Sequence, residues 1–285
     1  MASMRDIKRR RTSIQSTQQI TKAMKLVSTV KLQKARGRAE DAYPYFTHVY
    51  EAVTSLLSMS DKLDHPYLQS GQSEKAAVIV ISSNRGLAGG YNSNIVKKLT
   101  GSTLKKENVK VYAVGGKARD SLRNKGYEIA ADHSAVMEHP HYADAMEICH
   151  EVLEAFTAGE IGEIYMVYTH FKNTVSHIPT MMKLLPVEFD EADAPATDKR
   201  LLMNYEPNEE EVLNLIIPKY VTSLFYGAFV DALASENGAR MQAMDSATSN
   251  AEDMISDLTL KYNRVRQGTI TQELTEIIAG AEAIS

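Results

Sequence analysis

The first residues in the chain that could form a binding site are cations. The segment DIKRRRTS, residues 6–13, places one lysine and three arginines in succession in a chain whose net charge is −4. Such a cluster attracts nucleic acid, an anionic membrane surface or an acidic protein, and a solvated helix face has the same composition. Base-reading and aromatic residues are missing around it, while Arg11, Gln18 and Thr21 interrupt the apolar face that a membrane-surface helix needs. We therefore expect an acidic protein partner.

A second candidate is the glycine-rich segment SSNRGLAGGYN, residues 82–92, which follows an apolar run. Glycine-rich turns after a strand often hold phosphate at the start of a helix. The spacing here is G-x-x-G-G, which is not the dinucleotide-binding pattern, and no lysine followed by serine or threonine completes a P-loop. The segment GGK, residues 115–117, lacks the upstream glycine of a P-loop. We expect a tight strand-to-helix turn and no bound cofactor.

Catalytic and metal-binding patterns are absent from the sequence. His139 and His141 have no third ligand at a useful spacing, so a solvated loop is favoured over a metal site. Cys149, the only cysteine, lies in an amphipathic helical pattern. The motifs G-x-S-x-G, H-E-x-x-H and C-x-x-C do not occur. The sequence predicts no metal site, no catalytic residues and a chain that is not an enzyme by itself.

Composition and charge narrow the class of protein. Hydrophobic residues make up 44% of the 285 residues and charged residues 24%, as in ordinary soluble proteins. A single cysteine excludes a disulfide framework and favours a reducing compartment, and no apolar stretch approaches the roughly 20 residues that span a bilayer. Residues 1–40 carry 11 basic and 2 acidic side chains, whereas residues 207–285 carry 5 and 12. The oppositely charged ends favour antiparallel pairing.

Helical periodicity dominates both ends of the chain. Residues 3–58 read as one long helix that Pro44 should bend, and residues 208–285 read as another in which Pro218 should cause a kink or a restart. A stripe of small residues in the second helix lets two helices approach closely. We expect an antiparallel coiled coil between an N-terminal helix, 1–58, and a C-terminal helix, 208–285. The seam is weakest where Gln18 and Thr21 occupy core-like positions.

The middle of the chain alternates strands with helices. Strands are predicted over 76–82, 110–115, 127–131, 163–171 and 177–187, and helices over 92–106, 117–126 and 141–158. Linkers are expected at 61–75 and 189–200. This alternation predicts a small α/β domain with a largely parallel sheet, residues 76–188, inserted between the two long helices.

Three stretches of the sequence carry a resemblance to a known family. They are residues 6–35, the glycine-rich segment 82–92, and residues 234–281, which end in Ile270-Thr271-x-Glu273-x-x-Glu276-x-x-x-Gly280-Ala281. Together they resemble the gamma subunit of F-type ATP synthases over the whole chain. The resemblance implies a coiled coil with an inserted Rossmann-like domain. It also implies a central-stalk rotor that couples proton-driven rotation of the membrane c-ring to the catalytic beta subunits, or the reverse during ATP hydrolysis.

The resemblance implies partners and contact residues as well. The partners would be the alpha and beta subunits, the epsilon subunit and the c-ring, on the cytoplasmic side of the cell membrane, without nucleic acid and without insertion into the bilayer. Arg266 and Gln267 match the pair that contacts a polar catch loop of beta, and Met24 matches a methionine of the coupling region. The remaining matches are the cations that face an acidic lever segment of beta, Arg85 and Lys97, and the foot residues near epsilon and the c-ring, Tyr205 and Glu206.

Departures from the family pattern concern charge. Asn84 stands where the family usually has aspartate, and Ala88 where many members have cysteine. The amide is expected to leave Arg85 freer to meet an acidic partner. Arg11 occupies a seam position that is commonly apolar, so we hypothesise that Arg9, Arg10 and Arg11 form an electrostatic latch on the acidic segments of beta. The alternative class is a stand-alone coiled-coil scaffold or a nucleic-acid-binding rod.

Overall fold

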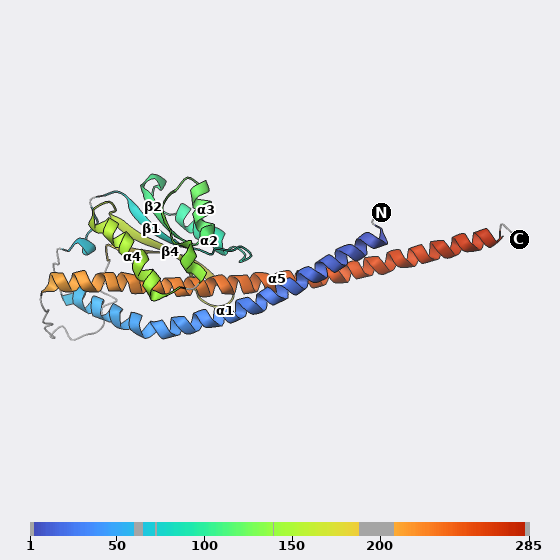
Figure 1. Cartoon of the computed structure of the whole chain (residues 1–285), viewed down its shortest axis with the longest axis horizontal. Coiled ribbons are helices and arrows are strands. Elements are labelled where there is room, and N and C mark those ends of the chain that lie inside the picture. The colour runs from blue at the N-terminus through green and yellow to red at the C-terminus, as the bar shows by residue number, and fades with distance from the viewer. Residues whose placement is uncertain (1–2, 60–64, 72, 139, 188–207, 283–285) are drawn as a thin grey trace. The chain divides into compact units, whose positions relative to one another are not determined.

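The computed structural model describes residues 3–59, 65–71, 73–138, 140–187 and 208–282 (Figure 1). These residues form two compact units. One contains the described residues up to Ser28 together with those from Met241 onward, and the other spans Thr29–Arg240. The two longest helices, α1 (Met4–Met59) and α5 (Glu209–Glu282), contribute to both units. The first half of α5 thus belongs to the same unit as the sheet, and the predicted domain boundaries remain a prediction.

The sheet of the larger unit has five strands in the order β3-β2-β1-β4-β5. Their bounds are β1 (Ala76–Ile81), β2 (Val109–Val114), β3 (Glu128–Asp132), β4 (Glu163–Phe171) and β5 (His177–Leu185). The first four strands run parallel, while β5 pairs antiparallel with β4. All six residues of the central β1 are buried, as its continuous apolar sequence requires. The predicted α/β sheet is confirmed.

Helices cover both faces of this sheet (Figure 1). On one face, α2 (Tyr91–Thr100) and α3 (Gly116–Asn124) pack against β1 residues Val78 and Val80. On the other face, α4 (Tyr142–Thr157) and the first half of α5 pack against the alternate residues of β1. Phe225 and Phe229 of α5 are fully buried there. Short 3-10 helices complete the unit at Pro66–Leu68, Lys106–Asn108 and Ser134–Glu138.

The smaller unit is an antiparallel pair of helices. Along α1, Arg11, Gln18, Thr21 and Lys25 meet α5 residues whose numbers decrease, namely Tyr262, Glu252, Thr248 and Asp245. Buried side chains in this pair include Ile7 and Leu258, together with Thr21 at 8% exposure. The predicted antiparallel pairing is therefore present, and Thr21 occupies the seam as expected.

Several details differ from the sequence-based expectations. The helix α5 does not restart at Pro218, because buried Ile217 and Phe225 on either side pack against the same sheet and keep one helical path. The helix expected over 92–106 ends at Thr100, where Gly101 provides the C-cap. Within the expected linker 61–75, Tyr67 is buried in the core beside Phe156, with the ring centroids 6.1 Å apart. Apolar periodicity alone does not reveal these packing effects.

Candidate partner-binding surfaces

The basic cluster at the start of α1 contains two kinds of arginine. Arg9 is solvated, with its side chain 84% exposed, and pairs with Asp6 across 3.4 Å. Arg10 is also exposed. Arg11 is half-buried, and its guanidinium carbon lies 5.5 Å from the centre of the Tyr262 ring on α5. Its Nε is buried without a hydrogen-bond partner. Arg11 is therefore part of the helix pair, whereas Arg9 and Arg10 face outward.

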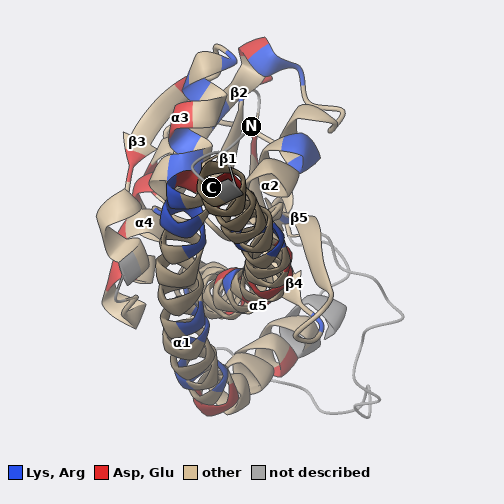
Figure 2. Cartoon of the chain, turned by 90° about the vertical axis from the view of Figure 1, so that its right-hand side faces the viewer, with Lys and Arg blue, Asp and Glu red and all other residues tan. Residues whose placement is uncertain are grey.

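Cations recur along α1 beyond this cluster, as the blue segments of the helix show (Figure 2). Lys25 donates to Asp245 of α5 over 2.6 Å. Met24, the residue of the predicted coupling region, is half-buried beside it in the chain. Opposite charges thus help to align the two helices in register, although exposed pairs of this kind contribute only about 0.2–1 kcal/mol each.

The glycine-rich segment forms the loop that joins β1 to α2. The Ser83 backbone N–H donates to Asn92 Oδ1 over 3.0 Å, and the Ser83 hydroxyl donates to the Arg85 carbonyl over 2.6 Å. From α5, Arg240 reaches the Gly86 carbonyl at 3.4 Å while pairing with Glu236 at 2.7 Å. Arg240 and Glu236 are largely buried. The loop is thereby fixed at several points, and it presents Arg85 and Leu87 to solvent.

Asn84 ties this loop to two neighbouring segments. Its Nδ2 donates to the Ser134 carbonyl over 2.7 Å, and its Oδ1 accepts from the Gly116 backbone N–H over 2.9 Å. An aspartate could accept from Gly116 at the start of α3 but, when ionised, could not donate to Ser134. The amide therefore has a structural role of its own, which the sequence pattern did not indicate.

The other predicted contact residues occupy separate places. Lys97 is exposed in the last turn of α2. Arg266 and Gln267 are exposed neighbours on α5, one turn beyond Tyr262. Tyr205 and Glu206 lie outside the described residues. Arg85 lies in the β1–α2 loop and Lys97 on α2, both in the larger unit. Arg266 and Gln267 lie on α5 in the smaller unit.

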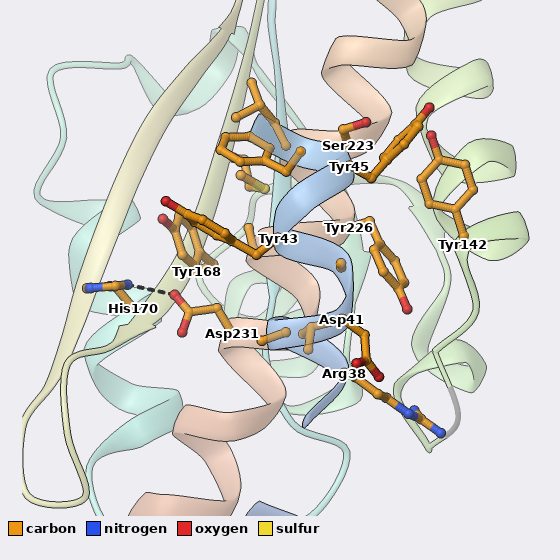
Figure 3. A pocket seen from close by; sticks show the side chains of 18 of the residues that line it. Arg38, Asp41, Tyr43, Tyr45, Tyr142, Tyr168, His170, Ser223, Tyr226 and Asp231 are labelled. Carbon is orange, nitrogen blue, oxygen red and sulfur yellow. Dashed lines mark hydrogen bonds and ion pairs between the residues drawn. The ribbon is translucent and has the colours of Figure 1, made fainter. Parts of the chain in front are cut away.

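A tyrosine-lined cavity of about 920 Å³ lies in the larger unit, between α1, α5, α4 and the strands β4 and β5 (Figure 3). Near Pro44, α1 has no buried residue between Ala35 and Val53, which means that it stands away from the core there. The Tyr142 ring meets the rings of Tyr45 and Tyr226, with centroids 6.1 and 5.5 Å apart. Periodicity indicated a continuous apolar face and so did not predict this cavity.

Polar groups border the cavity at one side. His170 Nδ1 and Asp231 Oδ2 are 2.6 Å apart (Figure 3), and Asp231 also accepts from the Phe171 backbone N–H. Burial, followed by the hydrogen bond with Tyr45, raises the pKa of Tyr142 to about 12. The contacts of Asp231 with His170 and Phe171 fasten α5 to the end of β4, whereas Tyr142 lies on α4.

The described residues contain no site suited to metal binding or to thiol chemistry. No group of three or more His, Cys, Asp or Glu side chains in that part of the chain could hold a metal ion. His139, half of the histidine pair noted in the sequence, lies outside it. Cys149 is buried, and burial raises the pKa of its thiol to about 12. The thiolate needed for nucleophilic chemistry is therefore not accessible.

One described helix, α5, contains a window that is long and apolar enough to cross a membrane. This differs from the expectation that no such stretch exists. However, 44% of the window is buried inside the protein, and Leu213, Ile217 and Val221 pack into the core on the sheet. A core helix of a soluble unit has the same composition.

The described residues define a protein that combines an α/β sheet unit with an antiparallel pair of long helices, and each unit carries exposed cations. The family model for ATP synthase matches residues 3–284. The chain is 65% identical over 291 residues to the ATP synthase gamma chain of Lachnoclostridium phytofermentans, with full coverage of both. The chain belongs to the gamma chain family of ATP synthases. It is a central-stalk subunit of that enzyme and is not itself catalytic.

A further relative agrees with this assignment, and solved structures share the fold. The sodium-ion-specific ATP synthase gamma chain of Acetobacterium woodii is 41% identical, with 99% of each chain covered. The fold is shared with a chain of the Euglena gracilis mitochondrial ATP synthase, with a TM-score of 0.71, 19% identity and coverage of 99% and 94%. A chain of the Tetrahymena thermophila central stalk and c-ring gives a TM-score of 0.59 at 24% identity, with coverage of 80% and 99%.

Proposed function

We propose that this subunit is the rotor that couples proton-driven rotation of the c-ring to ATP synthesis at the beta subunits, and the reverse during hydrolysis. The observation that carries the proposal is the α1–α5 pair, in which α5 continues beyond Tyr262, the partner of Arg11, as a helix whose residues from Arg266 to Ala281 are all exposed. Such a surface suits a shaft enclosed by other subunits. We place the subunit on the cytoplasmic side of the membrane, as a peripheral component.

The physical basis of coupling is differential contact. One asymmetric shaft inside a threefold ring touches each catalytic subunit differently. It can shift their nucleotide affinities only by the difference in its contact free energy between their conformations. Rotation of the shaft then changes the nucleotide affinity of each catalytic subunit in turn. A chain with no catalytic cluster among its described residues is sufficient for this role.

Three sets of residues would make these contacts. Arg266 and Gln267 would hydrogen-bond the catch loop of beta, since a guanidinium fork matches a carboxylate. The cations proposed to face the acidic lever segments are Arg9, Arg10, Arg11, Arg85 and Lys97. Of these, Arg9, Arg10, Arg85 and Lys97 are exposed, which supports the proposal, whereas Arg11 is engaged with Tyr262. Met24 would transmit packing changes in the coupling region.

Assembly at the opposite end of the stalk completes the proposal. The epsilon subunit and the c-ring would bind the α/β unit at its foot, with Tyr205 and Glu206 at the contact. The alpha and beta subunits would surround the helix pair.

Affinity purification of the tagged chain from a detergent extract of native membranes tests the proposal. Recovery of the alpha, beta and epsilon subunits with ATPase activity is the expected result. The alternative class, a free scaffold or a nucleic-acid-binding rod, predicts recovery of the chain alone, or with nucleic acid that is released at high salt. Either of those outcomes would overturn the rotor proposal.

A further inference from the structure

None of the described residues assigned to rotor contacts lines the tyrosine-lined cavity of the larger unit. The cavity measures about 920 Å³, a volume that accommodates a whole small molecule. All of its lining residues lie within Thr29–Arg240, so one compact unit forms it. Five tyrosines from α1, α4, β4 and α5 contribute to its walls: Tyr43, Tyr45, Tyr142, Tyr168 and Tyr226.

The tyrosine rings form a wall that attracts positive charge. In Figure 3, Tyr43 and Tyr168 lie to one side of α1, and the other three tyrosines lie to its other side. Tyr142 meets Tyr45 and Tyr226 edge to face, at interplanar angles of 88° and 74°. The face of an aromatic ring carries partial negative charge, and a cation within about 6 Å of its centre is attracted to it.

Asp231 adds a carboxylate to this wall. Its Oδ1 accepts from the Phe171 backbone N–H over 3.0 Å, and its Oδ2 lies 2.6 Å from His170 Nδ1. An ionised carboxylate offers about four acceptor positions, so these two bonds leave room for a further donor. Burial, followed by the negative charge of Asp231, raises the pKa of the Tyr168 phenol. The phenol therefore stays neutral, and the charge of Asp231 acts on the same part of the wall.

The other charged residues at the cavity do not cancel this attraction. Arg38 is the only lysine or arginine among the described lining residues, and its exposed guanidinium extends away from the tyrosines (Figure 3). Asp41, one turn further along α1, supplies a second carboxylate at the edge. His170 is charged only when protonated. The cavity is therefore complementary to an apolar molecule that carries one positive charge.

A glycine in the middle of α5 keeps the cavity open. Gly227 lines the cavity, and a Cβ added there would meet no atom within 4 Å. Glycine lowers the stability of a helix interior relative to alanine, so this position gives up helix stability and leaves space instead. The space can hold a ligand that contacts α1 on one side and α5 on the other.

We propose that this cavity is a binding site for a small amphipathic cation, an ammonium group on an apolar alkyl or aryl body. The ammonium group binds between Asp231 and the rings of Tyr43 and Tyr168. The apolar body extends toward Tyr142 and Tyr226. Binding joins α1 to α5 and the sheet at the place where the chain alone leaves a cavity. The site does not depend on the rotor contacts proposed above.

Calorimetric titration of the full chain with three probes tests the chemistry of the ligand. The probes share one apolar body and differ in the head group: 4-phenylbutylammonium, 4-phenylbutanol and 4-phenylbutyrate. The ammonium should bind about tenfold more tightly than the alcohol, because only it is attracted by Asp231 and the ring faces, and the carboxylate should bind most weakly. Equal affinities, a preference for the alcohol or the carboxylate, or no binding of the ammonium would overturn the proposal.

A cavity-filling variant tests the place of binding. Gly227→Leu should weaken 4-phenylbutylammonium binding at least tenfold, because the new side chain occupies the cavity. It should melt at the same or a higher temperature, since leucine is the better helix former. Gly37→Leu is the matched control, because Gly37 lies in α1, has no atom within 4 Å of an added Cβ and does not line the cavity. Undiminished binding by Gly227→Leu would reject the site.

Tyr43→Leu tests the contribution of the ring faces and does not depend on the folding of Gly227→Leu. Tyr43 is 67% exposed, so its replacement should leave the fold intact. Leucine keeps apolar bulk but has no aromatic face, so the variant should bind 4-phenylbutylammonium about threefold more weakly and 4-phenylbutanol as wild type does. An equal loss for both probes, or no loss for the ammonium, would contradict the proposed placement of the cation.

Discussion

At the scale of single residues, Arg11 shows how a neighbour can change the role of a side chain. Sequence alone places it with Arg9 and Arg10 in one basic run, and the predicted latch treats the three alike. In the structure, Arg11 stacks on Tyr262 and has a buried, unpartnered Nε, whereas Arg9 and Arg10 are exposed. A cation in a seam between Ile7 and Ile14 stabilises the pair less than an apolar residue of similar length would.

Substituting these arginines separates the two roles. In the assembled complex, Arg9→Gln with Arg10→Gln should change the ATPase rate at low salt, and the difference should vanish at high salt because exposed charges are screened. Arg11→Leu should instead raise the stability of the isolated chain by about 1 kcal/mol by completing the apolar seam. ATPase assays across a salt series and urea denaturation are the measurements. An unchanged low-salt rate in the double variant would dismiss the latch.

Glu163 makes the stability of the sheet sensitive to acid. Burial would raise the pKa of Glu163, but hydrogen bonds from Lys183 and Tyr165 outweigh it, and the pKa falls below its ordinary value of 4.5. A carboxylate whose pKa is lower in the folded state stabilises the fold above pH 4.5, and this contribution is lost as the pH falls through the folded pKa.

Glu163→Gln should therefore be less stable than wild type at pH 7, and the difference should shrink toward pH 3. Urea denaturation at each pH measures it, with Glu128→Gln, which removes an exposed carboxylate from β3 in the same sheet, as the control for lost charge. An undiminished difference between Glu163→Gln and wild type at pH 3 would contradict this assignment.

At the scale of elements, the paired helices are joined by polar contacts as much as by apolar ones. Thr21 Oγ1 and Thr248 Oγ1 are 2.8 Å apart across the seam, and each hydroxyl also lies within hydrogen-bond distance of a carbonyl of its own helix. When one hydroxyl donates to the other across the seam, the accepting hydroxyl can still donate to its own carbonyl. Gln18 donates to Glu252 one turn away. These contacts favour one register of the two helices, since a shift along the axis would separate Thr21 from Thr248 and Gln18 from Glu252.

A double-mutant cycle on Thr21→Val and Thr248→Val measures this coupling. Each single variant should cost about 1 kcal/mol by removing one hydroxyl from the pair. The double variant should cost no more than one single variant, because two apolar groups then face each other. Urea denaturation of the isolated chain supplies the four free energies. Strictly additive losses would show that the two hydroxyls do not interact.

The secondary structure could largely be predicted from periodicity, since the strands and long helices have clear patterns. The seam could be predicted only in part. The apolar residues Ile20 and Val27 are 59% and 57% exposed, while the polar Thr21 is buried. Helical spacing predicts an apolar face but not its partner, and the partner of Thr21 is Thr248 on α5.

Local sequence patterns also could not predict how the partner-binding surfaces are assembled. The hydrogen bond from Arg240 to the Gly86 carbonyl joins residues 154 positions apart in the chain, which no local pattern can relate. The cavity behind Pro44 likewise depends on where α1 leaves the core. The family resemblance identified Arg85, Arg266 and Gln267 as predicted contact residues. It did not reveal the packing of Arg11 against Tyr262, which distinguishes Arg11 from Arg9 and Arg10.

At the scale of the whole molecule, the two ends of α5 have different surroundings. From Glu209 its first half forms a layer on the sheet, whereas every described residue from Arg266 to Ala281 is exposed. A helical end without tertiary contacts is marginally stable in water, because short helices draw their stability from packing. The rotor proposal supplies that packing through the surrounding subunits.

Hydrogen exchange followed by mass spectrometry tests this difference. Amides at 271–281 should exchange within seconds in the isolated chain and become protected when alpha and beta are added. Amides at 244–258, which face α1, should be protected in both states. Slow exchange at 271–281 in the isolated chain would show that this end is stable without partners.

The polar seam of the helix pair also has a thermal consequence. Among the described residues of this unit, the buried apolar side chains are only Ile7, Met244, Ala251 and Leu258. The heat-capacity change of unfolding rises with the apolar surface exposed and falls with the polar surface exposed. Melting of this pair should therefore change the heat capacity little per residue, and its free energy of unfolding should curve weakly with temperature. A shaft joined in this way keeps nearly the same margin of stability in a cold cell as in a warm one.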